Sequence, residues 1–299
     1  MKKLIEFKAE LIPRMNRMSV FANRKVLNDI LAGEWVSNIK MRGIEFAGYR
    51  AYTPNDDASL IDWKASLRAN KTLIKELEIE RSHNVFFLVD VSDSMLFAST
   101  EKLKCEYAAE IISSMTFAVL RAGDNVGMGM FTDKVVSKIF PQMGKKQYYR
   151  IIKELSNVNK YGGDFDIEKA IKYIVSFLNM KCTVIIVSDF IGMKENWQHY
   201  LELLAQDFNL IGIMIRDPRD EELPKDTGHV IIEDPYSQKK IYMDTKKCAE
   251  KYAENVRKEN EKIREVFSLT GSALIELRTD EDYFQNLIKF FKRGEKAWS

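Results

Sequence analysis

Residues 84–94 read Asn84-Val85-Phe86-Phe87-Leu88-Val89-Asp90-Val91-Ser92-Asp93-Ser94, an apolar run that ends in a cluster of side-chain oxygens. Branched and aromatic residues follow one another from 85 to 89 without polar alternation, which predicts a β-strand covered on both faces. Strands of this kind are typical of parallel sheets between two layers of helices. The polar residues after the run would then lie at the carboxyl edge of the sheet, where open α/β sheets bind their ligands.

Beyond this run, apolar stretches alternate with segments whose apolar residues recur at helical spacing. Strands are expected at 84–90, 126–131, 135–140, 181–188, 208–215 and 273–277, and helices at 101–122, 144–158, 166–179, 195–206, 246–269 and 282–292. Strands joined by long crossovers form parallel sheets with helices on both faces. The sequence therefore predicts an α/β fold with a doubly wound, mainly parallel, Rossmann-like sheet.

Two segments break this alternation. Residues 217–245 contain three prolines and two short strand candidates, 230–233 and 240–243, and we interpret them as a hairpin-bearing insertion. Residues 1–83 lack the strand and helix rhythm, and we expect a helical arm followed by an extended segment. We therefore predict an N-terminal extension over 1–83 and an α/β domain over 84–299 that includes the insertion.

The composition is that of a folded chain without an excess of either charge. Of 299 residues, 45% are hydrophobic and 30% charged, and 46 Lys and Arg nearly balance 44 Asp and Glu, for a net charge of +2. This composition argues against disorder and against a dedicated nucleic-acid binder, which needs a basic excess. No apolar run reaches the roughly 18 residues of a membrane span. Because the first residues also lack a signal-peptide pattern, we expect a cytoplasmic protein.

The oxygen cluster has the chemistry of a site for a hard cation. Alternate residues of an extended loop point the same way, so Asp90, Ser92 and Ser94 can converge on one point. One carboxylate and two hydroxyls suit Mg²⁺ or Mn²⁺. Three side chains leave octahedral positions open, and such a cation could accept a carboxylate from another molecule. The competing interpretation is structural: Asp93 or Ser94 could cap the following helix.

Two further loops are expected at the same site. Asp189 follows the strand at 181–188 and so lies at the same edge of the sheet, and Asp164 follows a Gly-Gly pair before the helix at 166–179. An oxygen from each loop could complete the first or second coordination shell. The predicted metal ligands are Asp90, Ser92, Ser94, Asp164 and Asp189.

The chain resembles known families at these residues and upstream of them. The pattern Asp90-x-Ser92-x-Ser94, the Gly162-Gly163 loop and Asp189 are together similar to the metal-ion-dependent adhesion site (MIDAS) of von Willebrand factor A (vWA) domains. Upstream, the signature of the DUF58 family is similar to two segments within 43–68, Gly43-Ile44-Glu45-Phe46-Ala47-Gly48-Tyr49-Arg50 and Ile61-Asp62-Trp63-Lys64-Ala65-Ser66.

This resemblance implies a vWA-like domain that works in cation-dependent protein–protein interaction rather than in catalysis. It also implies a MoxR-type AAA+ ATPase as partner in chaperone-like assembly, with an acidic side chain of the partner or its client bound to the cation. One departure is Asp164, where the family usually carries Thr. A carboxylate at this position makes the site more anionic. Alternatively, Asp166 faces the site and Asp164 caps the helix.

Two other functions stay open from the sequence. A Mg²⁺-dependent phosphohydrolase also places an Asp at the end of a strand, and it needs an acidic residue two positions later as general acid. That position is Ser92 here, and a serine hydroxyl cannot serve as the acid. The second is a scaffold with a vestigial metal site. The sequence contains no GxxxxGK[ST] phosphate loop, and its three histidines lie outside the site loops. We therefore expect a protein that is not an enzyme.

Overall fold

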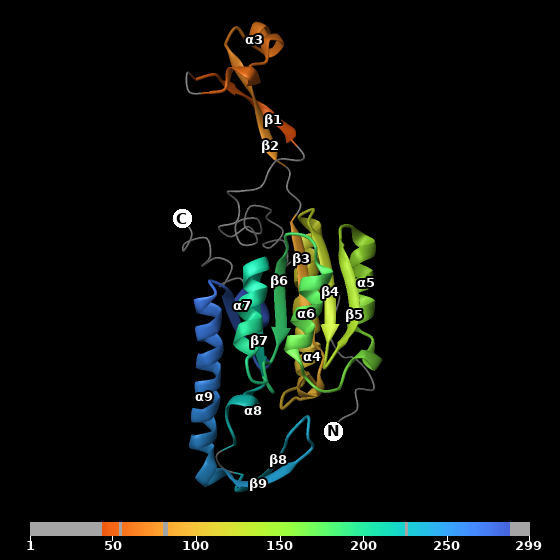
Figure 1. Ribbon diagram of the computed structural model, residues 1–299, viewed down its shortest axis with the longest axis vertical. Coiled ribbons are helices and arrows are strands. Elements are labelled where there is room, and N and C mark those ends of the chain that lie inside the picture. Colours follow the sequence, from red (N-terminus) through yellow and green to blue (C-terminus); the bar gives the residue numbers. More distant parts are fainter. Residues whose placement is uncertain (1–43, 54–55, 80–82, 225–226, 288–299) are drawn as a thin grey trace. The chain divides into compact units, whose positions relative to one another are not determined.

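The computed structural model describes residues 44–53, 56–79, 83–224 and 227–287 of the chain (Figure 1). These residues divide into two compact units, one within 34–82 and one that contains 83–287. The helical arm expected before residue 44 lies outside the described residues. So does the end of the helix expected at 282–292, of which residues 283–287 are helical.

The smaller unit is a β-hairpin with two short helical segments between its strands. β1 (Ile44–Ala51) pairs antiparallel with β2 (Leu73–Ile79). Between them lie a 3₁₀ helix (Ala58–Leu60) and α3 (Trp63–Ala69). The sequence predicted only an extended segment here, because charged residues interrupt the apolar residues of β1 and β2, and α3 has only seven residues.

Charged side chains fix the turns of this unit. The Arg50 guanidinium lies 2.6 Å from the Asp56 carboxylate and holds the pKa of Asp56 well below its usual range. Asp57 and Asp62 cap the two helical segments by accepting N–H groups of their first turns. Asp56, Asp57 and Asp62 therefore stabilise turns within their own unit.

The larger unit is built on a six-stranded sheet with the order β10-β7-β6-β3-β4-β5. Its strands are β3 (Asn84–Asp90), β4 (Asn125–Phe131), β5 (Val135–Gln142), β6 (Thr183–Ser188), β7 (Asn209–Arg216) and β10 (Ala273–Arg278). Neighbouring strands are parallel except for β5, which pairs antiparallel with β4. The predicted α/β fold with a doubly wound, mainly parallel sheet is confirmed.

Helices cover both faces of this sheet (Figure 1). They are α4 (Lys104–Arg121), α5 (Lys145–Leu155), α6 (Ile167–Phe177), α7 (Trp197–Asp207) and α9 (Thr245–Leu269). Two 3₁₀ segments, Asp93–Leu96 and Val158–Lys160, add single turns. Side chains of α4 and α5 belong to one buried cluster, and those of α6, α7 and α9 belong to another.

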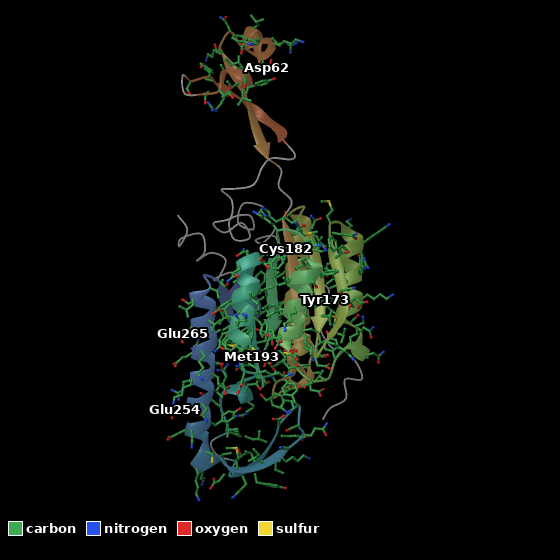
Figure 2. The ribbon with its side chains drawn as sticks, viewed as in Figure 1. Asp62, Tyr173, Cys182, Met193, Glu254 and Glu265 are labelled. Carbon is green, nitrogen blue, oxygen red and sulfur yellow. The ribbon has the colours of Figure 1, made fainter. Side chains whose placement is uncertain are left out.

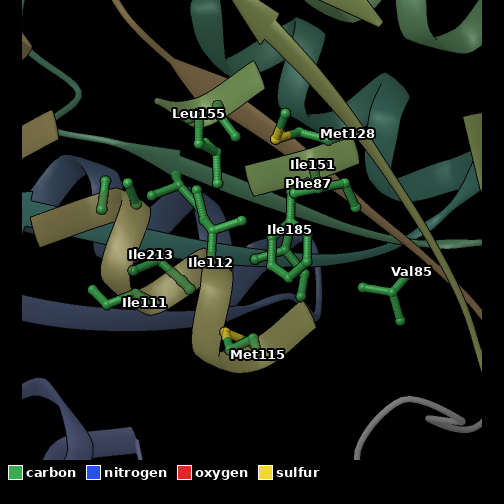
Figure 3. Close-up of a cluster of buried hydrophobic side chains, with 14 of the residues drawn as sticks. Val85, Phe87, Ile111, Ile112, Met115, Met128, Ile151, Leu155, Ile185 and Ile213 are labelled. Carbon is green, nitrogen blue, oxygen red and sulfur yellow. The ribbon is translucent and has the colours of Figure 1, made fainter. Parts of the chain in front are cut away.

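The two clusters use alternate residues of the same strands. On β3, Phe87 packs in the cluster of α4, whereas Phe86 packs in the cluster of α6, and both rings are fully buried. Figure 3 shows Phe87 together with Ile112 of α4 and Ile185 of β6. Each such ring contributes about 1.5–3 kcal/mol by leaving water. Covering on both faces explains why residues 85–89 of this strand are all apolar.

α9 shows the opposite pattern, with one buried and one solvated side. Ile263 and Phe267 are buried against the sheet. Glu254 and Glu265 project from α9 away from the sheet (Figure 2), and Glu254 pairs with Lys258 at 2.7 Å. These charged residues, which include both signs, therefore belong to the solvated face of the helix.

The insertion contains a short helix and the predicted hairpin. α8 (Pro218–Glu221) follows β7 directly, and β8 (His229–Glu233) pairs antiparallel with β9 (Lys240–Asp244) before α9 begins. α8 was not predicted from the sequence; it opens with a capping box of Asp217 and Asp220 around Pro218. Figure 1 shows the hairpin beyond the ends at which the parallel strands terminate.

The order of the strands creates a switch point beside β3. The chain leaves β3 for β4 on one side and later returns to β6 on the other side. The carboxyl ends of β3 and β6 are therefore neighbours, at the position where α/β folds bind ligands. Asp90 ends β3, and Ser188 ends β6.

Candidate metal centre

Asp90 is fully buried and has both carboxylate oxygens in hydrogen bonds. The N–H of Ser92 donates to Oδ1 at 2.9 Å, and the hydroxyl of Ser188 donates to Oδ2 at 2.6 Å. Ser188 is itself held in place, because its Oγ accepts the N–H of Phe190 at 2.9 Å. The end of β6 therefore orients the carboxylate at the end of β3.

The environment of Asp90 disfavours its ionised form. Burial, together with the nearby carboxylate of Asp189, raises the pKa of Asp90 to about 7. The hydrogen bonds from Ser188 and Ser92 act in the opposite direction. These two donors are neutral groups, so a cation bound beside Asp90 would add the positive charge that stabilises the carboxylate.

Ser92 and Ser94 follow in the same loop, with side chains that are 0% and 2% exposed. Ser92 has extended backbone angles and precedes the turn Asp93–Leu96, and the two hydroxyl oxygens lie 3.3 Å apart. Neighbouring ligands of a cation with bonds of about 2.1 Å are separated by about 3 Å, so this spacing suits a shared cation. The competing interpretation, in which Asp93 or Ser94 caps the following long helix, is wrong, because the cap residue of α4 is Leu103.

Asp189 follows β6 and is also fully buried, but its carboxylate is paired inside the protein. Oδ1 accepts the N–H of Ile191 at 2.9 Å, and Oδ2 accepts a hydrogen bond from the Lys104 ammonium at 2.6 Å. Lys104 also lies 2.8 Å from Asp220 of α8, and its side chain is 1% exposed. Burial acts to lower the pKa of Lys104, but the two carboxylates outweigh it, and the pKa is raised.

The Gly162-Gly163 pair binds the first loop through its backbone. The N–H of Gly162 donates to the carbonyl of Val91 at 2.8 Å, and the carbonyl of Gly163 accepts the N–H of Asp93 at 2.9 Å. Both glycines have left-handed φ values, and a Cβ at Gly162 would lie 3.2 Å from Oδ1 of Asp93. That oxygen is buried and has no hydrogen-bond partner among the described residues. The two loops thus enclose an unpaired acceptor.

Asp164 differs from the other predicted ligands because its side chain is exposed. Its Oδ1 accepts the N–H of the next residue, Phe165, at 2.9 Å. The cap of α6 is Asp166, which accepts the N–H of Lys169 and lies 3.0 Å from the Lys194 ammonium. The alternative in which Asp164 caps this helix is therefore wrong.

A side chain of the insertion also reaches the site. Tyr236, in the turn between β8 and β9, has its hydroxyl 3.3 Å from Ser92 Oγ and donates to the carbonyl of Ile191 at 3.1 Å. The hairpin was predicted from the sequence, but this tyrosine was not predicted to lie at the site. The local sequence of a turn contains no pattern that indicates which part of the fold the turn contacts.

The donor set fits a hard divalent cation. Asp90, Ser92 and Ser94 supply one carboxylate and two hydroxyl oxygens, the ligand type that Mg²⁺ and Mn²⁺ prefer. Over the residues that the structure describes, no group of three or more His, Cys, Asp or Glu side chains is placed to hold a metal ion. A cation here would therefore depend on the serine hydroxyls, with Asp189 already engaged and Asp164 exposed.

Comparison with known proteins identifies relatives that have no assigned function. Residues 48–262 match the family described as "Protein of unknown function DUF58". "Uncharacterized protein Rv1480" of Mycobacterium tuberculosis is 24% identical over 281 residues, which cover 92% of this chain and 88% of that protein. "Uncharacterized protein YeaD" of Bacillus subtilis is 30% identical over 111 residues, 37% of this chain and 25% of that protein.

Solved structures with a similar arrangement include BatB from Bacteroides thetaiotaomicron, with a TM-score of 0.46 and 15% identity over 73% of this chain and 98% of that chain. A von Willebrand factor type A protein from Catenulispora acidiphila has a TM-score of 0.35 and 14% identity over 48% of this chain and 35% of that chain.

Among the described helices, none combines the length and apolar character needed to cross a membrane.

Proposed function

This protein belongs to the DUF58 family, and we propose that it is a non-enzymatic module that binds a partner protein through a divalent cation. The observation that carries this proposal is the convergence of the Asp90 carboxylate with the hydroxyls of Ser92 and Ser94. All three side chains are buried at the carboxyl edge of the sheet, and the two hydroxyl oxygens are 3.3 Å apart.

Each of these residues has a defined part in the proposed interaction. Asp90 supplies the charge, and Ser188 fixes the orientation of its carboxylate. Ser92 and Ser94 supply neutral oxygens, so the site carries little negative charge of its own. Bound there, Mg²⁺ or Mn²⁺ would offer a Lewis-acidic position to an incoming carboxylate. A low charge on the protein ligands leaves more of the cation's charge for that carboxylate.

The resemblance to DUF58 and to vWA domains indicates the kind of partner. We propose a protein that presents an Asp or Glu side chain, either a MoxR-type AAA+ ATPase or its client, in chaperone-like assembly.

Capture of a MoxR-type ATPase by the immobilised protein tests this function. We expect recovery of the ATPase in Mg²⁺, and at least tenfold less in EDTA or with Asp90→Asn. The matched control is Asp207→Asn, which removes an exposed carboxylate at the end of α7, just before β7 begins at the opposite edge of the sheet. Equal recovery of the ATPase in Mg²⁺ and in EDTA would contradict the cation-dependent mechanism.

A second candidate function, a scaffold with a vestigial cation site, is favoured by the pairing of Asp189. Both of its oxygens are already used, by Ile191 and Lys104. Calorimetric titration of Mg²⁺ and Mn²⁺ separates the two candidates. An interaction module binds the cation and loses that binding in Ser92→Ala and Ser94→Ala, whereas a vestigial site shows no binding to lose.

A further inference from the structure

The turn of the β8–β9 hairpin holds Tyr236 in a fixed position. Oδ1 of Asp234 accepts the N–H groups of Tyr236 and Ser237, each at 2.8 Å, and the carbonyl of Asp234 accepts the N–H of Gln238 at 3.0 Å. Gln238 takes a left-handed φ of 57°, which closes the turn. Tyr236 is therefore presented by a turn that is ordered by its own hydrogen bonds.

The phenol of Tyr236 lies against the metal residues and the loop after β6. Its hydroxyl donates to the carbonyl of Ile191 at 3.1 Å and lies 3.3 Å from Ser92 Oγ. Its ring packs on Gly192, where an added Cβ would lie 2.5 Å from Cε2 of the ring. Gly192 thus leaves the space that the ring occupies, with a left-handed φ of 83°.

We propose that Tyr236 is a lid on this site, an internal group that occupies the approach to Ser92 and that an incoming carboxylate must displace. The inference rests on the proposed function and adds a way in which that function is regulated. Ser92 is 0% exposed and Ser94 is 2% exposed in this closed arrangement. An acidic side chain of a partner therefore reaches the site only after the hairpin turn moves, and the hairpin controls access.

The architecture of the insertion allows such a movement. β8 and β9 form a two-stranded sheet of their own, separate from the six-stranded sheet. Two-stranded ribbons are only marginally stable by themselves and move more readily than the strands of a large sheet. Ile231 and Tyr242, which face each other across the ribbon, are 55% and 76% exposed. These two side chains are therefore not held by the core.

Binding of a small carboxylate to the Mn²⁺-loaded protein tests the lid. N-acetylglutamate is titrated while water-proton relaxation reports the accessible water on bound Mn²⁺. We expect Tyr236→Ala to bind this probe at least fivefold more tightly than the unaltered chain and to show higher relaxivity before the probe is added. Tyr236→Phe keeps the ring and loses the hydroxyl, and an intermediate gain is expected. Tyr242→Ala, on the same hairpin, should behave like the unaltered chain.

The outcomes separate the lid from the function on which it rests. If every protein binds Mn²⁺ but Tyr236→Ala and Tyr236→Phe bind the probe no more tightly than the unaltered chain, the lid is overturned and the cation site stands. If no protein binds Mn²⁺, the proposed function fails, and the lid fails with it. If Tyr236→Ala does not fold, Tyr236→Phe decides the question, because it removes one oxygen atom and leaves the packing on Gly192 in place.

Discussion

Lys104 lies between two carboxylates at the edge of the sheet, with its ammonium 2.6 Å from Asp189 and 2.8 Å from Asp220. Its side chain is 1% exposed, and that of Asp189 is 0% exposed, so water screens their charges weakly. The lysine neutralises Asp189, which would otherwise add its charge to the metal centre. The negative charge that a bound cation meets is therefore mainly that of Asp90.

Loss of this lysine should destabilise the fold. We expect Lys104→Met to lower the free energy of unfolding by about 3–5 kcal/mol, because buried carboxylates are left without a cation. Urea denaturation measures the loss. The matched control is Lys172→Met, whose ammonium pairs with Glu168 at 2.6 Å but is 61% exposed. An exposed pair with this spacing contributes about 0.5 kcal/mol or less, so equal losses in the two variants would contradict the role of Lys104.

The same residues show how far a site can be predicted from a sequence. Asp90, Ser92, Ser94 and Asp189 could be placed together because each ends or follows a buried strand, and the fold brings the carboxyl ends of these strands to one edge. Lys104 could not, because its partner Asp189 is 85 positions away and a lysine is almost never fully buried unless it is paired. A single sequence contains no periodicity that reports such a long-range pair.

At the scale of elements, α9 approaches the sheet closely at one point. A Cβ at Gly212 of β7 would lie 2.5 Å from Cζ of Phe267, and Phe267 is 1% exposed. A glycine inside a strand often marks such a close approach of another group. The contact joins the helix that follows the insertion to the middle of β7, next to the edge strand β10.

Gly212→Ala should therefore overpack this contact. We expect a loss of about 1–3 kcal/mol in the free energy of unfolding, because the new methyl group meets a buried ring that has little room to move. Phe267→Leu removes part of the ring, so the double variant should lose less than the sum of the two single variants. Strictly additive losses in urea denaturation would show that Gly212 and Phe267 are not coupled.

Elements differed in how well the sequence predicted them. The strands of the large sheet and its long helices were predicted because their periodicity extends over many residues. For β1 and β2 only an extended segment was predicted, because charged residues interrupt their apolar residues, and α3 was missed because it spans only seven residues. α8 was missed although Asp217-Pro218-Arg219-Asp220 contains the signal of a helix start, an acidic cap followed by Pro and a second acid at the third helical position.

At the scale of the whole molecule, strand order decides which loops meet. Asp90 and Ser188 are 98 positions apart, yet they are hydrogen-bonded because β6 lies beside β3. The sequence predicted a parallel sheet from its crossovers, but not the neighbours of each strand, because strand order depends on the packing of whole layers. For the same reason it predicted the hairpin of the insertion without its contact to Ser92.

A cation that binds only the folded chain stabilises the whole molecule. With Mg²⁺ at 100 times its Kd, the gain is about 2.7 kcal/mol, which raises the Tm of a domain of this size by about 5–10 °C. Calorimetry in Mg²⁺ and in EDTA measures this difference. Asp90→Asn should abolish it, because the only acidic ligand of the proposed set is lost, whereas Asp207→Asn should keep it. An equal Tm in Mg²⁺ and EDTA at millimolar Mg²⁺ would mean that the folded chain gains nothing from the cation, and the buried serine hydroxyls would then serve packing alone.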